Sequence, residues 1–294
     1  MNHEATSPAR APITAPFDPL ILLQDGESRR LQVVCLPGAG ASITSLMELT
    51  GALDRERTVY GLQPRGIETG EDPHASVEEA AKCNLAALTR VGLASGFHLI
   101  GHSHGGAIAF EMALRMQDAG RPPQSLTLID SRPPTAAAAP PPRTLTDAEI
   151  LADFVDALRR TFEGRLFMDT NHAHEASIDR ALPRMREAMI AAGILSPRSH
   201  PHVLHGPYAT YATARRMVYR PDSSYRGPGR LVLVRDANRT VEADLERQRD
   251  YAGRWRTNVT NLVIWQGQGN HYSILRPPHV DGLAGWWREL ATDA

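Results

Sequence analysis

Short apolar segments alternate with helical segments along the first half of this chain. Apolar runs at 31–36, 97–100 and 125–129 are each short, and a run of this length that is rich in β-branched residues is typical of a buried strand. A helix with a capping box is expected from Ser76, and a second helix is expected over 105–119. Strands that alternate with helices predict an α/β fold with a mainly parallel sheet and helices on both faces.

The remaining strands and helices are expected around a long helical insertion. Further strands are expected at 20–23, 58–62, 230–234 and 262–265, and further helices at 146–162, 178–192, 208–219, 242–255 and 278–290. Residues 143 to about 225 contain no convincing strand, so 136–225 is expected to be an insertion, and an insertion of this length usually carries function. We therefore expect a core formed by 17–135 and 226–294, with the insertion as a helical lid. The polar residues 1–16 predict a flexible leader or linker.

Charge and apolar patterning exclude several classes of protein. The 294 residues include 32 basic and 33 acidic side chains, so the chain lacks the basic field that attracts nucleic acid. No apolar run reaches the roughly 18 residues of a membrane span, and the N-terminus lacks the apolar core of a signal peptide. We therefore expect a cytoplasmic protein with neither nucleic acid nor membrane as a partner. In that compartment Cys35 and Cys83 are expected to be reduced thiols.

The pentapeptide Gly101-His102-Ser103-His104-Gly105 lies between an expected strand and an expected helix. This is the setting of a G-x-S-x-G nucleophile elbow, in which a strained turn projects the serine hydroxyl above the edge of the sheet. The flanking glycines leave room for the neighbouring strand and helix. We therefore predict that Ser103 is a nucleophile. The alternative is a turn serine that only caps the helix.

A serine hydroxyl is a weak nucleophile and requires a base. His271 is the best-placed histidine, because it follows the last expected strand in the Ser, Asp, His chain order of α/β hydrolases. Two aspartates, Asp130 and Asp236, follow expected strands and are candidates for the acid that orients the base. Both lie at the carboxyl ends of strands, where sites in such sheets form. Placement alone therefore leaves both open.

Backbone N–H groups are expected to stabilise the oxyanion that such a nucleophile would form. One donor should be His104, and the other should be Gly38 or Ala39 in the glycine-rich loop after the strand at 31–36. This loop lacks the spacing of the phosphate-binding motifs, so no nucleotide is expected. Histidines also gather in the insertion, at His172, His174, His200, His202 and His205. They lack acidic or cysteine partners at ligand spacing, so we interpret them as loop histidines and expect no metal.

Several segments together resemble one known family. They are the start Phe17-Asp18-Pro19-Leu20, the loop 36–40, the stretch Leu62-Gln63-Pro64-Arg65-Gly66 with Pro73-His74, and the segments 101–106, 128–131 and 269–272. Over about residues 17–290 the chain resembles the chain-terminating (type I) thioesterase domains of nonribosomal peptide synthetases and polyketide synthases. The resemblance implies an α/β-hydrolase fold whose mostly parallel central sheet is flanked by helices and covered by a helical lid.

The resemblance also bears on the site. It favours Asp130 as the acid, whereas Asp236 stands where stand-alone editing (type II) thioesterases carry theirs. The sequence departs from the family at His104, where many relatives have an aromatic or aliphatic residue. That difference is expected to change the wall of the binding pocket, but it does not remove the backbone donor.

The function that the resemblance implies is release of an acyl, peptidyl or polyketide chain. That acyl, peptidyl or polyketide chain would be held as a thioester on the phosphopantetheine of an acyl or peptidyl carrier protein. The thioesterase itself would bind no cofactor. An acyl-O-Ser103 intermediate would then be released by hydrolysis, macrocyclisation or transfer. The alternatives are an editing thioesterase, an acyl-shuttling transferase, a general carboxylesterase or lipase, and a non-catalytic acyl-binding domain.

Arginines in the insertion are candidates for docking an acidic carrier. They form two groups, one with Arg159, Arg160 and Arg165 and the other with Arg215, Arg216 and Arg220. The alternative interpretation is that these arginines belong to a solvated helix face, which is the usual role of such runs.

Overall fold

A single seven-stranded sheet lies at the centre of the described part of the molecule. The computed structural model describes residues 17–26, 30–68, 70–136, 139–140, 143–162, 165–166, 177–236 and 238–291, so the predicted leader at 1–16 lies outside the described residues. The strands are β1 (Leu20–Gln24), β2 (Gln32–Leu36), β3 (Val59–Leu62), β4 (Phe97–His102), β5 (Ser125–Ile129), β6 (Tyr225–Arg235) and β7 (Val259–Asn270). Their order in the sheet is β1-β3-β2-β4-β5-β6-β7. Strand β1 runs antiparallel to β3, and the other neighbouring pairs are parallel, which confirms the predicted fold class.

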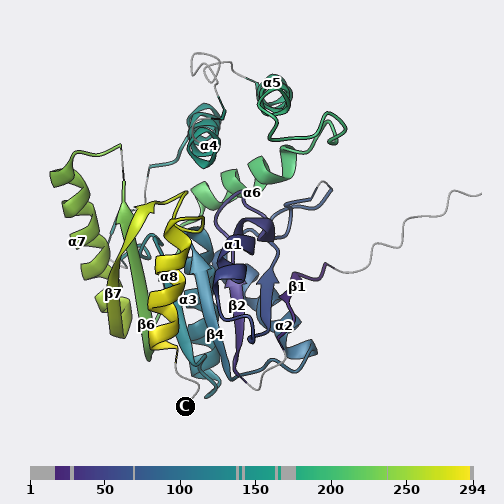
Figure 1. Ribbon diagram of the computed structural model, residues 1–294. Coiled ribbons are helices and arrows are strands. Elements are labelled where there is room, and N and C mark those ends of the chain that lie inside the picture. The colour runs from purple at the N-terminus through teal and green to yellow at the C-terminus, as the bar shows by residue number, and fades with distance from the viewer. Residues whose placement is uncertain are drawn as a thin grey trace, which may run out of the picture.

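Helices cover both faces of this sheet (Figure 1). They are the 3-10 helix η1 (Ile43–Leu46) and the α-helices α1 (Met47–Ala52), α2 (Val77–Arg90), α3 (His104–Asp118), α4 (Asp147–Thr161), α5 (Ile178–Ala191), α6 (His205–Arg216), α7 (Val241–Asn258) and α8 (His279–Leu290). Apolar residues of α2, α3 and α7 belong to one core cluster, and those of α1 and α8 belong to a second. None of the helices in these described ranges is long and apolar enough to cross a membrane.

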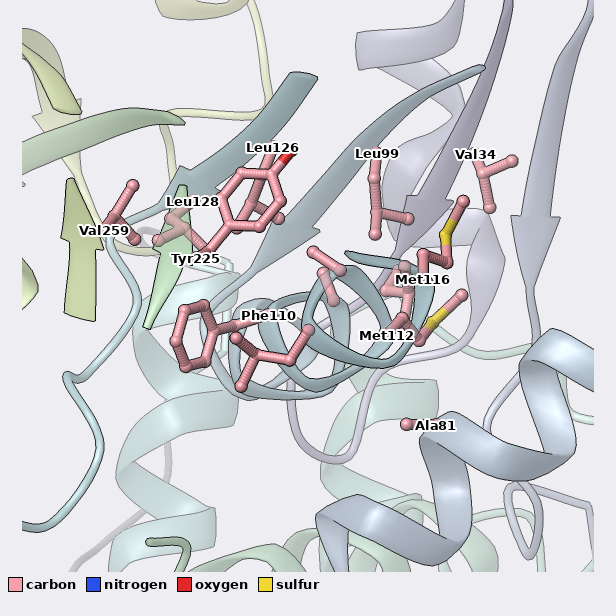
Figure 2. Packing of buried hydrophobic residues seen from close by; sticks show 14 of the residues in the cluster. Val34, Ala81, Leu99, Phe110, Met112, Met116, Leu126, Leu128, Tyr225 and Val259 are labelled. Carbon is pink, nitrogen blue, oxygen red and sulfur yellow. The ribbon is translucent and has the colours of Figure 1, made fainter. Parts of the chain in front are cut away.

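Strand β2 illustrates how the sequence supplies both cores. Val33 and Cys35 belong to the cluster with α1 and α8, whereas Val34 and Leu36 belong to the cluster with α2 and α3. Successive side chains of a strand point to opposite faces, so a strand that is apolar at nearly every position is buried on both sides. Figure 2 shows the cluster with α2 and α3, with Phe110 of α3 beneath the strands. The two layers place the carboxyl ends of the parallel strands at one edge of the core.

Two strands are longer than the sequence predicts. The strand expected at 230–234 is β6, which begins at Tyr225, so this residue belongs to the sheet and not to the predicted insertion. The strand expected at 262–265 is β7, which continues to Asn270. Both extensions contain glycines that resemble turn signals, but cross-strand pairing between β6 and β7 outweighs that local preference. His271 therefore follows its strand directly.

Several helix predictions also needed correction. The helices η1 and α1 were not predicted, because they are short and carry no clear apolar period. At the start of α2, Ser76 Oγ accepts a hydrogen bond from the Glu79 N–H at 3.1 Å, as a capping box requires. The Glu79 carboxylate, however, accepts from the Ala75 N–H and not from that of Ser76. Helix α6 begins three residues earlier than expected and ends at Arg216, because Met217 adopts an extended backbone conformation. Both cysteines are free, as expected for thiols, and burial raises the pKa of Cys35 to about 12.

Three helices, α4, α5 and α6, lie between β5 and β6 in the chain, within the predicted insertion. They share an apolar cluster of their own, and Figure 1 shows them together above one end of the sheet. Helix α4 begins with a complete capping box between Thr146 and Glu149. Helix α6 is joined to α4 by ion pairs, of which Arg215 to Asp153 measures 2.5 Å. The insertion is thus a small packed unit above the sheet.

Candidate active site

The chain order of the sheet creates a crevice between β2 and β4. The chain passes from β2 outward to β3, while β4 continues to β5 on the other side, so the connections diverge at this point. In open α/β sheets, ligands bind at such switch points, outside the carboxyl ends of the strands. The loop after β2 carries Gly38 and Ala39, and β4 leads into Ser103. All three residues line a chamber of about 820 Å³, whose walls also include residues of α4 and α6.

Ser103 occupies a strained turn between β4 and α3. Its backbone has φ 55° and ψ −121°, in a region that favours glycine, and such a conformation costs about 1–3 kcal/mol. The Ser103 N–H donates to the Ile129 carbonyl oxygen at 2.8 Å, which ties the turn to β5. A Cβ added at Gly101 would collide with the backbone of Gly105 and Gly106, and one added at Gly105 would collide with the loop after β2. The glycines therefore allow the close packing that holds the serine in place.

We expect the substitution Gly101→Ala to destabilise the protein. Its Cβ would lie 2.5 Å from the Gly106 Cα, and backbone on this buried turn has no room to move away. Overpacking of this kind costs about 2 kcal/mol, so the thermal midpoint should fall by about 4 °C or more. Calorimetry or thermal circular dichroism measures the change. The matched control is Gly253→Ala, at an exposed helical site with open space, which should raise stability slightly.

The carboxylate of Asp130 lies directly beside His271. Its Oδ2 accepts a hydrogen bond from His271 Nδ1 at 2.7 Å, across 141 residues of sequence. The Asp130 side chain is 6% exposed and that of His271 is 31% exposed, so the carboxylate is buried and the imidazole faces the chamber. Asp130 follows β5 with φ 42°, and its N–H donates to the Val232 carbonyl oxygen of β6 at 2.8 Å. Ser103 lines the same chamber as this pair.

Hydrogen bonds to the backbone of the turn at 270–273 fix the position of His271. The side-chain oxygen of Asn270 accepts from the N–H groups of Tyr272 at 2.9 Å and Ser273 at 3.1 Å. His102 Nε2 lies 3.0 Å from the His271 carbonyl oxygen, which can only accept, so Nε2 carries the proton and donates. Burial, followed by the charge of His271, lowers the pKa of His102 to about 3, so this ring is neutral. His102, which precedes Ser103 in the elbow, thus anchors the backbone of His271.

Arg247 of α7 is a residue of the site that the sequence analysis missed. Its Nη1 lies 3.5 Å from Asp130 Oδ1, a buried oxygen that has no hydrogen-bond partner in the described part of the chain. Asp244, 4% exposed, accepts from Arg247 Nε at 2.9 Å and from Gln248 Nε2 at 2.9 Å. Burial raises the pKa of Asp130, but the hydrogen bond from His271 and the nearby positive charges outweigh it and hold the pKa below its usual value. No local sequence signal distinguishes Arg247 from the other arginines of α7.

We expect the double substitution Arg247→Met with Asp244→Asn to move the acidic limb of the kcat/KM profile to higher pH. The pKa of Asp130 is depressed in the folded protein, so its carboxylate persists below the usual pKa. Arg247 places a positive charge beside the Asp130–His271 pair, which opposes protonation of the pair. Removing the guanidinium therefore lets the pair take up the proton that removes the base at a higher pH, by up to about one pH unit. Replacing Asp244 as well avoids a buried carboxylate without its cation, which by itself is strongly destabilising. An acidic limb that stays in place would contradict this role for Arg247.

Asp236, the alternative acid, takes part in a different set of contacts. Its carboxylate accepts from Arg239 Nε at 3.1 Å and from the Asn238 N–H at 3.1 Å, and its side chain is 32% exposed. It lines the chamber, but His271 Nδ1 is directed to Asp130. The structure therefore brings Asp130, and not Asp236, into contact with the predicted base.

The predicted oxyanion donors surround Ser103. Gly38, Ala39 and His104 all line the chamber with the serine, and a Cβ added at Gly38 would lie 3.2 Å from the Ser103 Cβ. The loop after β2 thus approaches the elbow closely, as an oxyanion site requires. The His104 side chain also lies on the chamber wall, where burial lowers its pKa to about 4 and keeps it neutral. The role of the backbone N–H groups of Gly38, Ala39 and His104 as oxyanion donors stays a prediction.

The histidines of the insertion contact one another. His202 Nδ1 lies 3.3 Å from His205 Nε2, and the His200 and His202 rings are 5.5 Å apart. The described residues contain no group of three or more His, Cys, Asp or Glu side chains that could hold a metal ion. His172 and His174 lie outside the described residues.

Five of the six arginines predicted to dock a carrier make contacts within this chain, whereas Arg159 makes none with the described residues. Arg160, Arg215 and Arg216 form ion pairs with Asp156, Asp153 and Asp147, and Arg165 and Arg220 donate to the backbone carbonyl oxygens of Gly193 and Ala139. These guanidinium groups hold the insertion together. A role of these arginines in docking a carrier stays a prediction.

Solved structures of thioesterase domains share this fold. The Vlm2 thioesterase domain gives a TM-score of 0.63 at 23% sequence identity, and the match covers 92% of this chain and 96% of that one. The NocB thioesterase domain, in covalent complex with a fluorophosphonate nocardicin G analog, gives a TM-score of 0.57 at 19% identity and covers 88% and 93%. At such identities the likeness shows the fold alone.

Curated relatives match a shorter part of the chain. Indigoidine synthase from Streptomyces lavendulae is 36% identical over 106 residues, which is 36% of this chain and 8% of that protein. An atromentin synthetase from Suillus grevillei is 30% identical over 120 residues, which is 41% of this chain and 12% of that protein. The matched part is thus only about a tenth of the length of these curated relatives.

The family assignment rests on a match over most of the sequence. The family model described as thioesterase domain matches residues 31–276, a range that contains Ser103, Asp130 and His271. It also contains the loop after β2 and the whole helical insertion. The chain belongs to the thioesterase domain family.

Proposed function

We propose that this domain releases an acyl or peptidyl chain from the phosphopantetheine thioester of a carrier protein, through an ester on Ser103. The observation that carries the proposal is the 2.7 Å hydrogen bond between His271 Nδ1 and Asp130 Oδ2, in the chamber that Ser103 also lines. A histidine oriented by a buried acid beside a strained serine is the arrangement of a serine hydrolase. Membership of the thioesterase domain family supports a thioester as the bond attacked.

The hydrogen bond to Asp130 determines which nitrogen of His271 acts as the base. Asp130 is ionised and only accepts, because its pKa lies below the usual value. His271 Nδ1 therefore carries the proton, and Nε2 keeps a free lone pair. In the proposed reaction this lone pair accepts the Ser103 hydroxyl proton while Oγ attacks the thioester carbonyl carbon. Asp130 then stabilises the imidazolium that forms.

Collapse of the tetrahedral intermediate completes the first half of the reaction. The N–H groups of His104 and of Gly38 or Ala39 would stabilise its oxyanion. The carbon–sulfur bond then breaks, and the sulfur takes the proton from His271 Nε2. The acyl group stays on Ser103, and the carrier leaves with a free thiol.

The second half of the reaction repeats these roles with a new nucleophile. His271 Nε2 accepts a proton from water, or from a hydroxyl or amine, as this group attacks the ester carbonyl. The proton then passes to Ser103 Oγ as the ester bond breaks. Hydrolysis, macrocyclisation and transfer share these steps. The helices α4 and α6 on the chamber wall would limit water around the ester, which is how a lid influences the outcome.

Intact-protein mass spectrometry tests this proposal directly. The protein is mixed with acyl-pantetheine thioesters and with alkyl esters of the same acyl groups. A mass increase equal to the acyl group, formed from thioesters, is the expected result, and the released products then distinguish hydrolysis from cyclisation and transfer. Faster transfer to a second carrier than to water would favour an acyl-shuttling transferase. Acylation by alkyl esters alone would contradict the proposal and favour a general esterase.

A further inference from the structure

The chamber above Ser103 is lined by far more arginine than acid. Seven arginines and two aspartates contribute to its walls, and among the described residues no lysine or glutamate does so. The whole chain, by contrast, carries 32 basic and 33 acidic side chains. Two histidines of the wall, His102 and His104, are neutral because burial lowers their pKa values to about 3 and about 4. Positive charge is therefore concentrated in the chamber.

Four of the seven arginines have carboxylate partners. The pairs are Arg160 with Asp156, Arg215 with Asp153, Arg239 with Asp236 and Arg247 with Asp244. Each of these guanidinium groups is largely neutralised by its own chain, so these four arginines do not explain the excess of charge.

The other three arginines, Arg132, Arg235 and Arg276, have no carboxylate within ion-pair distance in the described ranges of the chain. Arg276 donates to the Thr161 carbonyl oxygen and lies 5.7 Å from the centre of the Phe162 ring. Neither contact neutralises the charge. Arg132 and Arg235 have no hydrogen bond from their side chains to other described residues. The chamber thus contains three cations whose counter-charge is not supplied by this part of the protein.

These three arginines belong to the same end of the sheet. Arg132 follows β5, Arg235 ends β6, and Arg276 follows the turn after β7. The three strands are consecutive neighbours, and Arg235 is paired in register with Asn270, the residue before His271. The cations therefore lie on the His271 side of the chamber. The predicted oxyanion loop lies on the other side, after β2.

We infer that Arg132, Arg235 and Arg276 form a subsite for a carboxylate carried by the acyl chain of the substrate. The inference rests on the proposed function and names its substrate class, namely thioesters of dicarboxylic acids or of chains with an acidic side group. Guanidinium groups bind carboxylates through charge-assisted hydrogen bonds. Arg132 and Arg235 are exposed at the chamber wall and Arg276 is half-buried, so all three are accessible to a bound acyl chain. The phosphate of the pantetheine arm is the other anion in reach of this protein. It is less suited, because the arm separates the phosphate from the sulfur, whereas Arg132 lies two residues from Asp130 in the chain.

The experiment compares substrates that differ in a single charge. Adipoyl-N-acetylcysteamine carries a free carboxylate and no phosphate, and its adipamoyl analogue replaces that carboxylate with a neutral amide of the same size. We expect kcat/KM for the acid to exceed that for the amide by several-fold, up to about 10-fold, in the wild type. A second pair, adipamoyl-pantetheine and adipamoyl-phosphopantetheine, isolates the effect of the phosphate. An equal rate for acid and amide would overturn the inference.

Variants connect this preference to the three arginines. Arg132→Gln and Arg235→Gln are each expected to reduce the ratio of acid to amide kcat/KM several-fold, and the double variant should remove most of the preference. Neither side chain holds another described element in place, so folding should be preserved. Arg256→Gln, at an exposed site of α7 outside the chamber, is the matched control and should leave the ratio unchanged. If the variants reduce only the preference for the phosphorylated arm, the phosphate is the anion bound and our inference is wrong.

Binding to an inactive protein separates this inference from the proposed function. Calorimetric titration of Ser103→Ala with the acid and amide thioesters reports affinity without turnover. Tighter binding of the acid supports the subsite even if the wild type releases neither thioester, a result that would overturn the proposed function alone. Equal binding of both, with normal turnover of both by the wild type, overturns the subsite and leaves the proposed function standing.

Discussion

Replacing Ser103 by alanine should abolish release of acyl chains from thioesters. In the proposed mechanism the Ser103 oxygen forms the covalent bond to the acyl group, so the variant has no nucleophile and cannot form the ester. Loss of the serine in a triad lowers kcat by about 10⁴-fold or more, because binding and oxyanion stabilisation alone give only slow background catalysis. Thiol release from an acyl-pantetheine substrate, followed with a thiol-reactive chromophore, measures the loss.

The Ser103→Ala variant should remain folded. The backbone strain at φ 55° is present in both proteins, and alanine removes only a hydroxyl group. Thermal unfolding near that of the wild type is the control that attributes the loss to chemistry. Intact mass should show no acyl adduct on the variant under conditions that acylate the wild type. Turnover near the wild-type rate would exclude Ser103 as the nucleophile and, with it, the proposed mechanism.

Replacing Asp130 by asparagine should lower kcat by about 10⁴-fold, while Asp236→Asn should change it less than about threefold. An asparagine amide at position 130 would donate to His271 Nδ1. The ring proton would then move to Nε2, where the lone pair for the Ser103 proton is needed. Asp236 holds Arg239 and its own turn, so its charge can be removed without changing the tautomer of His271. The two variants alter the same functional group on neighbouring strands.

Steady-state kinetics on both variants decide between the two candidate acids. The matched pair controls for the general effect of removing a negative charge from the chamber, which both carboxylates line. Comparable thermal midpoints would show that neither variant is unfolded. A large loss in Asp236→Asn with a small loss in Asp130→Asn would show that the hydrogen bond at 2.7 Å does not reflect the working enzyme, and that the acid follows β6.

The sequence by itself was sufficient to predict the mainly parallel sheet and the strained turn at Ser103, and to select His271 as the candidate base. Strand and helix alternation, and the glycines around Ser103, are local signals, because backbone conformation and periodic burial depend mainly on residues close in the chain. His271 could be chosen from chain order together with its place after the last strand. The predicted limits of β6 and β7 were wrong because glycines suggested turns there, whereas pairing between the two strands extends both of them.

Only the tertiary structure decided which groups meet. The sequence left Asp130 and Asp236 open on placement, since both end a strand, and the family resemblance had to favour one of them. In the structure His271 Nδ1 turns to Asp130 across 141 residues, and Arg247 with Asp244 approaches the same carboxylate from α7. Such contacts depend on the packing of strands and helices that are distant in the chain. The wall of the chamber is assembled from six or more separate segments of the chain. The excess of arginine on that wall therefore cannot be predicted from local composition and depends on the tertiary structure.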